Sequence, residues 1–323
     1  MKTLSKSSKG KSPQLLSVLI LTVFLSACDN AKKSDNSNSA YKPGEVEVLS
    51  QSMNLNIKDT APSGWTTFIF HNQSPNTHFF VLEKYPEAKI LDSAKKYVIP
   101  VFDAAMDSIM AGNNKAGMAE FANLPPWFSD VKFVGGVGLT APGTTTKTTF
   151  QLDSGYYVLE CYVKMPNGKF HSAIGMITDM MVTSIDGGGK KPEATEDIEI
   201  SGDNGISFTE NLSAGNHVFA VYFKNQKVHE NFVGHDLHLV RLSENFDVNK
   251  LNEWMNWINP SGLVSPTPDG MEFIGGRQEM PAGSSAFFTA NLTPGKYSFV
   301  SEVADPAKNN MLKIFTVPDN NTD

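Results

Sequence analysis

Cys161 is the residue of this chain with the clearest capacity for chemistry, because it is the only cysteine after the first thirty residues. It lies in the stretch "GYYVLECYVKMPNGKFHSAIGM", ten residues before His171 and fifteen before Met176. A lone thiol in an oxidising compartment is buried, metal-bound or reactive. The spacing alone leaves these three roles open, so the elements around Cys161 have to decide between them.

The N-terminus predicts export from the cytoplasm. Lysines precede the apolar run "LLSVLILTVFL", which is too short to span a bilayer, and "LSAC" follows and ends at Cys28. "LSAC" resembles the lipobox of bacterial lipoproteins, which implies cleavage after Ala27 and membrane attachment through lipidated Cys28. The alternative to a lipoprotein signal is an ordinary signal peptide or a short membrane anchor. Asp29 resembles the retention signal of enterobacterial lipoproteins, which implies the inner membrane, facing the periplasm.

The charge balance argues against one class of partner. Without the signal segment the chain has 23 basic and 34 acidic residues, a net charge near −11. Such a chain is not expected to bind nucleic acid, because phosphate backbones need basic surfaces. An acidic surface suits cationic or weakly docking protein partners, although acidity by itself usually serves solubility.

Composition shifts divide the chain into segments. We expect a signal peptide over residues 1–27, a polar tether over 28–45, and a first domain over 46–185. The Gly-rich and charged residues of 186–197 predict a linker, and a second domain follows over 198–323.

An internal repeat supports this division. "FVGGVGLTAPGTTTKTTFQLDSGYYVLECYV" from Phe133 aligns without a gap with "FIGGRQEMPAGSSAFFTANLTPGKYSFVSEV" from Phe273. Upstream, "WTTFIFHNQ" from Trp65 aligns with "VFAVYFKNQ" from Val218. The sequence therefore predicts a tandem duplication of one fold.

Short segments that alternate apolar and polar residues, separated by Gly and Pro turns, indicate strands. Seven such strands per copy predict an all-β protein of two tandem Greek-key β-sandwich domains, each with a short helical insert. Pro100 opens one expected helix, before Gly112, and Asp247 caps the other, which extends through Ile258. The strands expected in the first copy are 46–48, 66–70, 79–82, 131–134, 148–152, 156–163 and 174–182.

The pattern Gly155-x-Tyr157-x-Leu159-x-Cys161, with Met176 before another strand, resembles the last two strands of cupredoxins, the fold of plastocyanin and azurin. The resemblance is specific over residues 131–183, and the repeat extends it to the second domain. It implies one copper ion in a type 1 site. The implied ligands are the thiolate of Cys161, the imidazoles of His78 and His171, and an axial thioether from Met176.

One departure from the cupredoxin pattern concerns the loop after Cys161. Nine residues separate Cys161 from His171, where cupredoxins usually have two to four. "YVKMPNGKF" indicates a hairpin that turns at Pro166-Asn167-Gly168. If Met165 pairs with Lys169, alternation of side chains brings His171 to the same face as Cys161, so a shared ion is permitted but not required.

Each ligand also has an ordinary structural alternative. Cys161 and Met176 could fill the core, and the histidines could be polar residues at strand ends. The second copy has Ser301 in the place of Cys161, so it is not expected to bind copper in the same way. His229, His235 and His238 suggest another metal site, although in a strand His235 and His238 would point to opposite faces.

The same residues limit the functional classes. No histidine adjoins Cys161 and no His-x-His pair occurs, so a catalytic copper beside the type 1 site, and hence an enzyme, is not expected. The chain also lacks hydrolase, phosphate-loop and zinc-protease motifs. The resemblance implies single-electron transfer or copper handling, with a redox or copper-delivery protein as partner. The alternative is a metal-free β-sandwich that acts as a binding scaffold.

Overall fold

The computed structural model describes residues 42–319, and this part of the chain is all-β with helical inserts, as predicted. The signal segment, Cys28 and Asp29 lie outside the described residues, so export and lipidation stay predictions. Within residues 42–319, no helix combines the length and the apolar character needed to cross a membrane.

The strands follow one another along the chain in two groups, which are separated by residues 187–195 of the predicted linker. The first group comprises β1 (Glu45–Gln51), β2 (Asn54–Asn56), β3 (Thr60–Asn72), β4 (His78–Lys84), β5 (Lys132–Thr140), β6 (Thr145–Leu152), β7 (Gly155–Glu160) and β8 (Ile177–Asp186). The second group comprises β9 (Glu196–Ser201), β10 (Gly205–Phe208), β11 (Gly215–Phe223), β12 (Leu237–Leu242), β13 (Met271–Arg277), β14 (Ser285–Leu292), β15 (Gly295–Val300) and β16 (Leu312–Val317). The division into two domains stays a prediction.

Hydrogen bonds connect most strands in the order β10-β9-β11-β14-β6-β3-β8-β7-β4-β5-β13-β12-β15-β16, and β1 and β2 branch from β3. The long strand β3 changes partners along its length: residues 60–63 pair in parallel with β8, and residues 64–71 pair antiparallel with β6. Through this change of partner, β3 belongs both to the sheet that contains β6 and to the sheet that contains β8, β7 and β4. Phe68 of β3 accordingly contacts Phe80 of β4, with ring centroids 5.6 Å apart.

The strand order passes directly from the first half of the chain to the second in two places. β6 pairs antiparallel with β14, and Thr148 lies opposite Phe288, the residue with which the sequence repeat aligns it. β5 pairs with β13 through Thr140 and Ile274. The duplication stays an inference from sequence, but the two halves share hydrogen bonds and a common hydrophobic cluster.

The Gly-Gly pair of β5 permits a close approach of backbones. Gly136 has a φ of +132°, and a Cβ at this position would lie 2.1 Å from the carbonyl oxygen of Phe80. Gly276 makes the same approach to Leu237 in the second half. The pairing of β4 with β5 is also irregular at two points, so these glycines serve bulges rather than a phosphate-binding loop.

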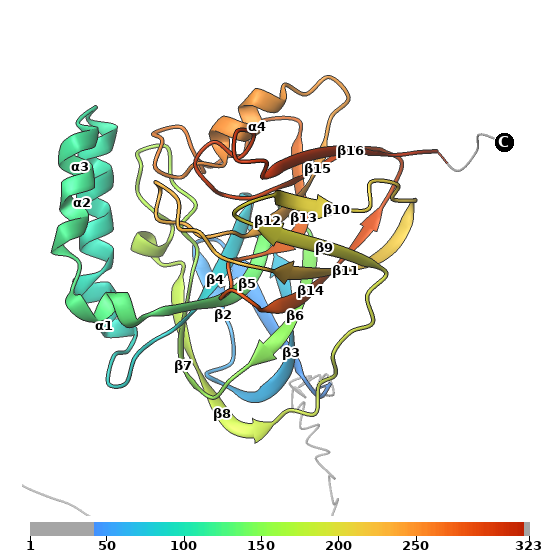
Figure 1. Cartoon of the computed structure of the whole chain (residues 1–323). Coiled ribbons are helices and arrows are strands. Elements are labelled where there is room, and N and C mark those ends of the chain that lie inside the picture. Colours follow the sequence, from blue (N-terminus) through green and yellow to red (C-terminus); the bar gives the residue numbers. More distant parts are fainter. Residues whose placement is uncertain (1–41, 320–323) are drawn as a thin grey trace, which may run out of the picture. The chain divides into compact units, whose positions relative to one another are not determined.

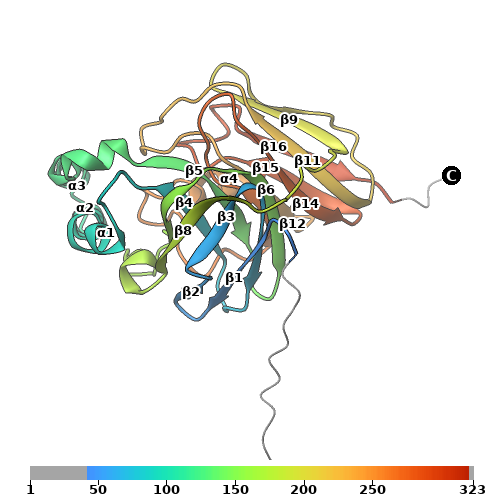
Figure 2. The same cartoon turned by 90° about the horizontal axis from the view of Figure 1, so that it is seen from below.

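The helices form two inserts, and in both views the larger one lies beside β4 and β5, outside the sheet (Figures 1 and 2). Pro100 lies in the first turn of α2, and the Asp247 side chain accepts a bond from Asn249 N, as expected for a cap. The second insert ends earlier than predicted, because the carbonyl of Trp254 accepts a bond from Leu263 N, where the chain turns back. The helices are α1 (Leu91–Tyr97), α2 (Ile99–Met110), α3 (Asn114–Glu120) and α4 (Val248–Trp254), with 3₁₀ turns at Phe121–Asn123, Pro126–Asp130 and Ser172–Ile174.

Candidate metal centre

Three of the four predicted ligands converge in the interior of the protein. The Sγ of Cys161 lies 3.6 Å from Nδ1 of His78 and 3.9 Å from Nδ1 of His171, and the two Nδ1 atoms are 3.1 Å apart. All three residues are fully buried. One sulfur and two nitrogens of the types that bind copper therefore face a single point.

The loop before β4 positions His78. The side chain of Asn72 donates to the carbonyls of Asn76 and Thr140, and its oxygen accepts from Ser74 N, so one buried amide closes the loop. Ser74 then places its Oγ 2.7 Å from Nε2 of His78. This contact holds the ring with Nδ1 toward the sulfur, an arrangement in which the second nitrogen of a metal ligand is fixed by the protein.

The hairpin predicted between the thiol and the second histidine is present. Met165 N donates to Lys169 O at 2.8 Å, and His171 N donates to Val163 O at 2.8 Å. His171 therefore lies on the same side of the hairpin as Cys161. β7 ends at Glu160, three residues earlier than predicted, and β8 begins at Ile177, three residues later than predicted, because a 3₁₀ turn precedes it.

The second half of the chain holds this hairpin in place. Lys164 N donates to Leu263 O at 2.7 Å, and Ser265 N donates to Lys164 O at 2.8 Å. The buried Lys164 Nζ donates to the carbonyls of Trp257 and Asn259. The additional residues between Cys161 and His171 thus reach the second half and fasten to it.

Ser265 also fixes the tautomer of the second histidine. Its hydroxyl donates to Lys164 O at 2.9 Å, so its oxygen is left to accept from Nε2 of His171, 3.3 Å away. His171 then carries its proton on Nε2 and presents a lone pair on Nδ1 to the sulfur. Sequence reasoning did not find Ser265, because no local signal connects positions 94 residues apart.

Met176 completes the predicted set by its position in the chain. Its side chain is fully buried, its N donates to His171 O at 2.9 Å, and its carbonyl accepts from Cys161 N at 3.0 Å. The backbone of Met176 is therefore bonded to both neighbouring candidates, and its role as an axial ligand stays a prediction.

Burial sets the protonation of the site without metal. Desolvation raises the pKa of Cys161 to about 12, which keeps the thiol protonated. It lowers the pKa of His171 to about 4 and, together with the neighbouring His171, the pKa of His78 to about 3. Both imidazoles are thus neutral near pH 7, the form that binds metal, and only the thiol proton has to be displaced. Copper fits this donor set.

As far as residue 319, where the described residues end, the second half does not repeat this group. Ser301 takes the place of Cys161, as predicted, and its hydroxyl donates to Asp236. A different buried group lies there, formed by Asp236, His238 and Glu302 with candidate atoms within 4.8 Å of one another. His229 and His235 contact each other separately, with ring centroids 5.3 Å apart and the rings tilted by 55°, so His238 belongs to the carboxylate group and not to a histidine cluster.

Removing the Ser265 hydroxyl should weaken copper binding without removing a ligand. We expect Ser265→Ala to reduce the affinity for Cu(II) by about 10–100-fold, because the ring of His171 loses the contact that orients it. A competition titration against a chelator of known affinity measures this change. Ser207→Ala, at an exposed position of β10, is the matched control and should bind as the wild type does. Equal affinity in both variants would contradict the orienting role.

No protein-family model and no curated protein sequence matches the chain. Among solved structures it is similar to auracyanin from Roseiflexus castenholzii, with 22% identity over 43% of this chain and 97% of that chain, at a TM-score of 0.26. It is also similar to a blue copper oxidase from Nitrosomonas europaea, with 12% identity over 85% of this chain and 84% of that chain, at 0.21. A copper-containing nitrite reductase from Thermus scotoductus SA-01 gives 12% identity over 85% and 61%, at 0.21. With TM-scores this low, the function has to be argued from the site itself.

The prediction that the protein is not an enzyme is corrected. The oxidase and the nitrite reductase are enzymes, and each match covers 85% of this chain. The exclusion rested on the absence of histidines beside Cys161. That pattern describes one arrangement of catalytic copper only, so its absence does not exclude an enzyme.

Proposed function

We propose that this chain is a lipid-anchored, extracytoplasmic protein that binds one copper ion at His78, Cys161, His171 and Met176, for single-electron transfer or copper handling. The observation that carries the proposal is the convergence of one thiol and two Nδ1 atoms on one buried point. A metal-free scaffold predicts no such convergence.

The surroundings of the site suit electron transfer. When bound, copper supplies a centre that gains and loses one electron. The chain holds both imidazoles by serine hydroxyls and clamps the hairpin to the second half, so the donor atoms move little when the charge changes. Burial of all three side chains keeps water from the sulfur. Attachment through Cys28 would keep the protein at the membrane surface, near a redox or copper-delivery partner.

A copper titration tests this proposal. The chain from Asp29 onward, reduced and metal-free, is titrated with Cu(II) while the visible spectrum is recorded. We expect one equivalent to bind and to produce an intense thiolate-to-copper band. Voltammetry then separates the two uses of the ion, since electron transfer requires reversible one-electron cycling with copper retained. A colourless protein without tight copper uptake would contradict the proposal.

The axial position offers a comparison within one molecule. We expect Met176→Leu to raise the reduction potential by about 60 mV or more, which corresponds to a tenfold shift in a one-electron equilibrium, because a donor to Cu(II) is lost. Met311 takes the equivalent place in the second half, because its carbonyl accepts from Ser301 N as that of Met176 accepts from Cys161 N, and it is also buried. Met311→Leu is therefore the control and should leave the potential unchanged. Equal potentials in the wild type and both variants would remove Met176 from the ligand set.

A further inference from the structure

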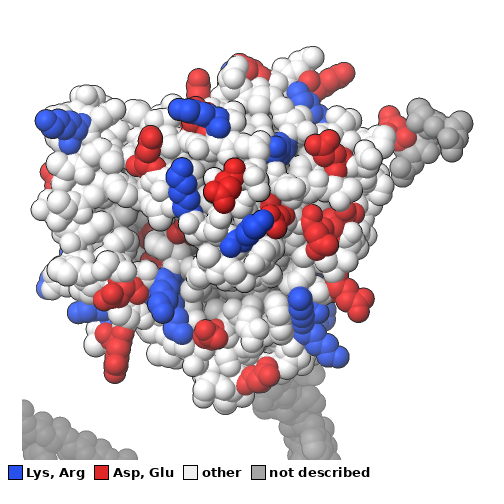
Figure 3. Space-filling model, in the orientation of Figure 1, with Lys and Arg blue, Asp and Glu red and all other residues white. Residues whose placement is uncertain are grey.

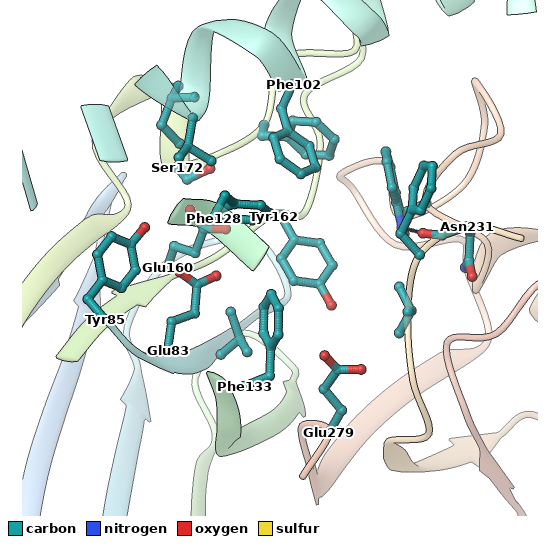
Figure 4. Close-up of a pocket in the computed structure, with 17 residues that line it drawn as sticks. Glu83, Tyr85, Phe102, Phe128, Phe133, Glu160, Tyr162, Ser172, Asn231 and Glu279 are labelled. Atoms are coloured by element: carbon teal, nitrogen blue, oxygen red, sulfur yellow. Dashed lines mark hydrogen bonds between the residues drawn. The ribbon is translucent and has the colours of Figure 1, made fainter. Parts of the chain in front are cut away.

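A cavity of about 120 Å³ lies between the larger helical insert, strands β4, β5 and β7, and a loop of the second half (Figure 4). For comparison, an apolar cavity of about 150 Å³ accommodates one benzene molecule, so this volume suits a compact ligand of few atoms. Nearly half of its lining residues are aromatic. The rings that line it belong to Tyr85, Phe102, Phe128, Phe133, Tyr162, Phe170, Phe232 and Trp257.

Four of these rings contact one another and form a connected part of the wall. Phe102 lies 6.2 Å from Phe128, Phe170 and Trp257, measured between ring centroids, and Phe170 lies 5.6 Å from Trp257. Aromatic faces carry negative electrostatic potential, so such a wall attracts a cation that has lost its water.

Three carboxyl groups share the same cavity. Glu83, Glu160 and Glu279 line it, whereas none of its described lining residues is basic. Figure 4 shows Glu83 and Glu160 side by side, with Glu279 beyond the Tyr162 ring. Burial raises the pKa of Glu279 to about 7, because the ionised carboxylate is desolvated in this cavity. The buried Oδ1 of Asn231, another lining residue, has no hydrogen-bond partner among the described residues.

The cavity lies next to the metal centre because successive side chains of the same segments point alternately to the two sites. Glu160 and Tyr162 flank Cys161, and Phe170 and Ser172 flank His171. The two ligands face the core while their neighbours face the cavity, so the two sites lie on opposite faces of the same segments. Figure 3 shows acidic side chains recessed in a hollow beside the helices, which offers a cation an approach from this face.

We propose that this cavity binds one small free organic cation of the alkylammonium class, with aromatic rings around its methyl groups and the carboxyl groups of Glu83, Glu160 and Glu279 balancing its charge. The hard divalent cations Mg²⁺ and Ca²⁺ fit less well, because they take six or more ligands, mostly oxygens, and nearly half of the lining residues are aromatic. The site is separate from the proposed copper site, and either can exist without the other.

Calorimetry with a matched pair of ligands tests this proposal. The full-length protein in a nonionic maltoside detergent, without copper, is titrated with choline and with 3,3-dimethylbutan-1-ol, which has the same shape and no charge. We expect choline to bind at least tenfold more tightly than the alcohol. Phosphocholine should also bind more weakly, because its phosphate would face the three carboxyl groups.

Two variants locate the binding. Glu279→Gln should weaken choline binding at least tenfold and leave binding of the alcohol unchanged. Phe102→Leu should weaken choline binding because one aromatic ring of the wall is lost. Glu193→Gln, exposed and remote from the cavity lining, is the control. Equal binding of choline and the alcohol would overturn the proposal, as would binding of Mn²⁺ in place of choline, or no binding by a wild-type protein that still takes up copper.

Discussion

Replacing Cys161 with serine is expected to abolish the intense visible band of the copper-loaded protein. The band arises from charge transfer between a thiolate and copper, and a hydroxyl cannot supply it. The chain from Asp29 onward contains no other cysteine, so no second thiol can substitute. Copper affinity should fall as well, by at least a hundredfold, because one of three converging donors is lost.

A histidine variant outside the site serves as the control for Cys161→Ser and His78→Gln. His71 lies on β3, bonded to Thr145 and outside the three-residue group, so His71→Gln should keep the band. His78→Gln should instead replace the band with a weaker spectrum of altered geometry, because its Nδ1 no longer faces the sulfur. Circular dichroism checks that each variant is folded. A band that persists in folded Cys161→Ser would exclude Cys161 as a ligand.

The parts of the site that sequence predicted correctly are those in which neighbouring residues determine the outcome. The hairpin between Cys161 and His171 followed from Pro166-Asn167-Gly168 and from simple alternation, and its hydrogen bonds are as expected. The cap at Asp247 has the same local origin.

The parts that sequence missed depend on contacts between distant segments. Ser265 reaches His171 only because Lys164 pairs with the segment that follows α4, and periodicity within either segment does not reveal this. His238 was grouped with nearby histidines by type, although its partner is a carboxylate two residues away. The sequence overestimates the length of the helix in the second insert. The carbonyl of Trp254 accepts from Leu263 N, whereas in a longer helix it would accept from a residue of the next helical turn.

Asp236 connects the two halves through a buried hydrogen-bond network. Its carboxylate accepts from Nε2 of His238 at 2.8 Å, from the Ser301 hydroxyl at 2.7 Å and from Glu302 N at 2.6 Å. Leu139 N, in the first half, donates to Nδ1 of His238 at 3.0 Å, which leaves the histidine proton on Nε2, facing Asp236. One side chain thus satisfies three buried donors and supports a contact between halves.

Asp236→Ala is therefore expected to cause the largest loss of stability among the changes considered. It leaves three donors without an acceptor, and breaking a buried charged network in this way costs about 3–5 kcal/mol in the free energy of unfolding. The attraction that Asp236 exerts on the buried guanidinium of Arg277 is lost as well. Urea unfolding at pH 7 measures the change as a lower midpoint with an unchanged slope.

Two further variants separate the network from a general effect of lost charge. Asp236→Asn retains one carbonyl oxygen, so it should lose about half as much stability as the alanine variant. Asp130→Ala removes an acid at an exposed position and should change the midpoint negligibly. If the alanine variant lost less than about 1 kcal/mol, the donors would have found other acceptors, and Asp236 would not be the residue that holds the halves together.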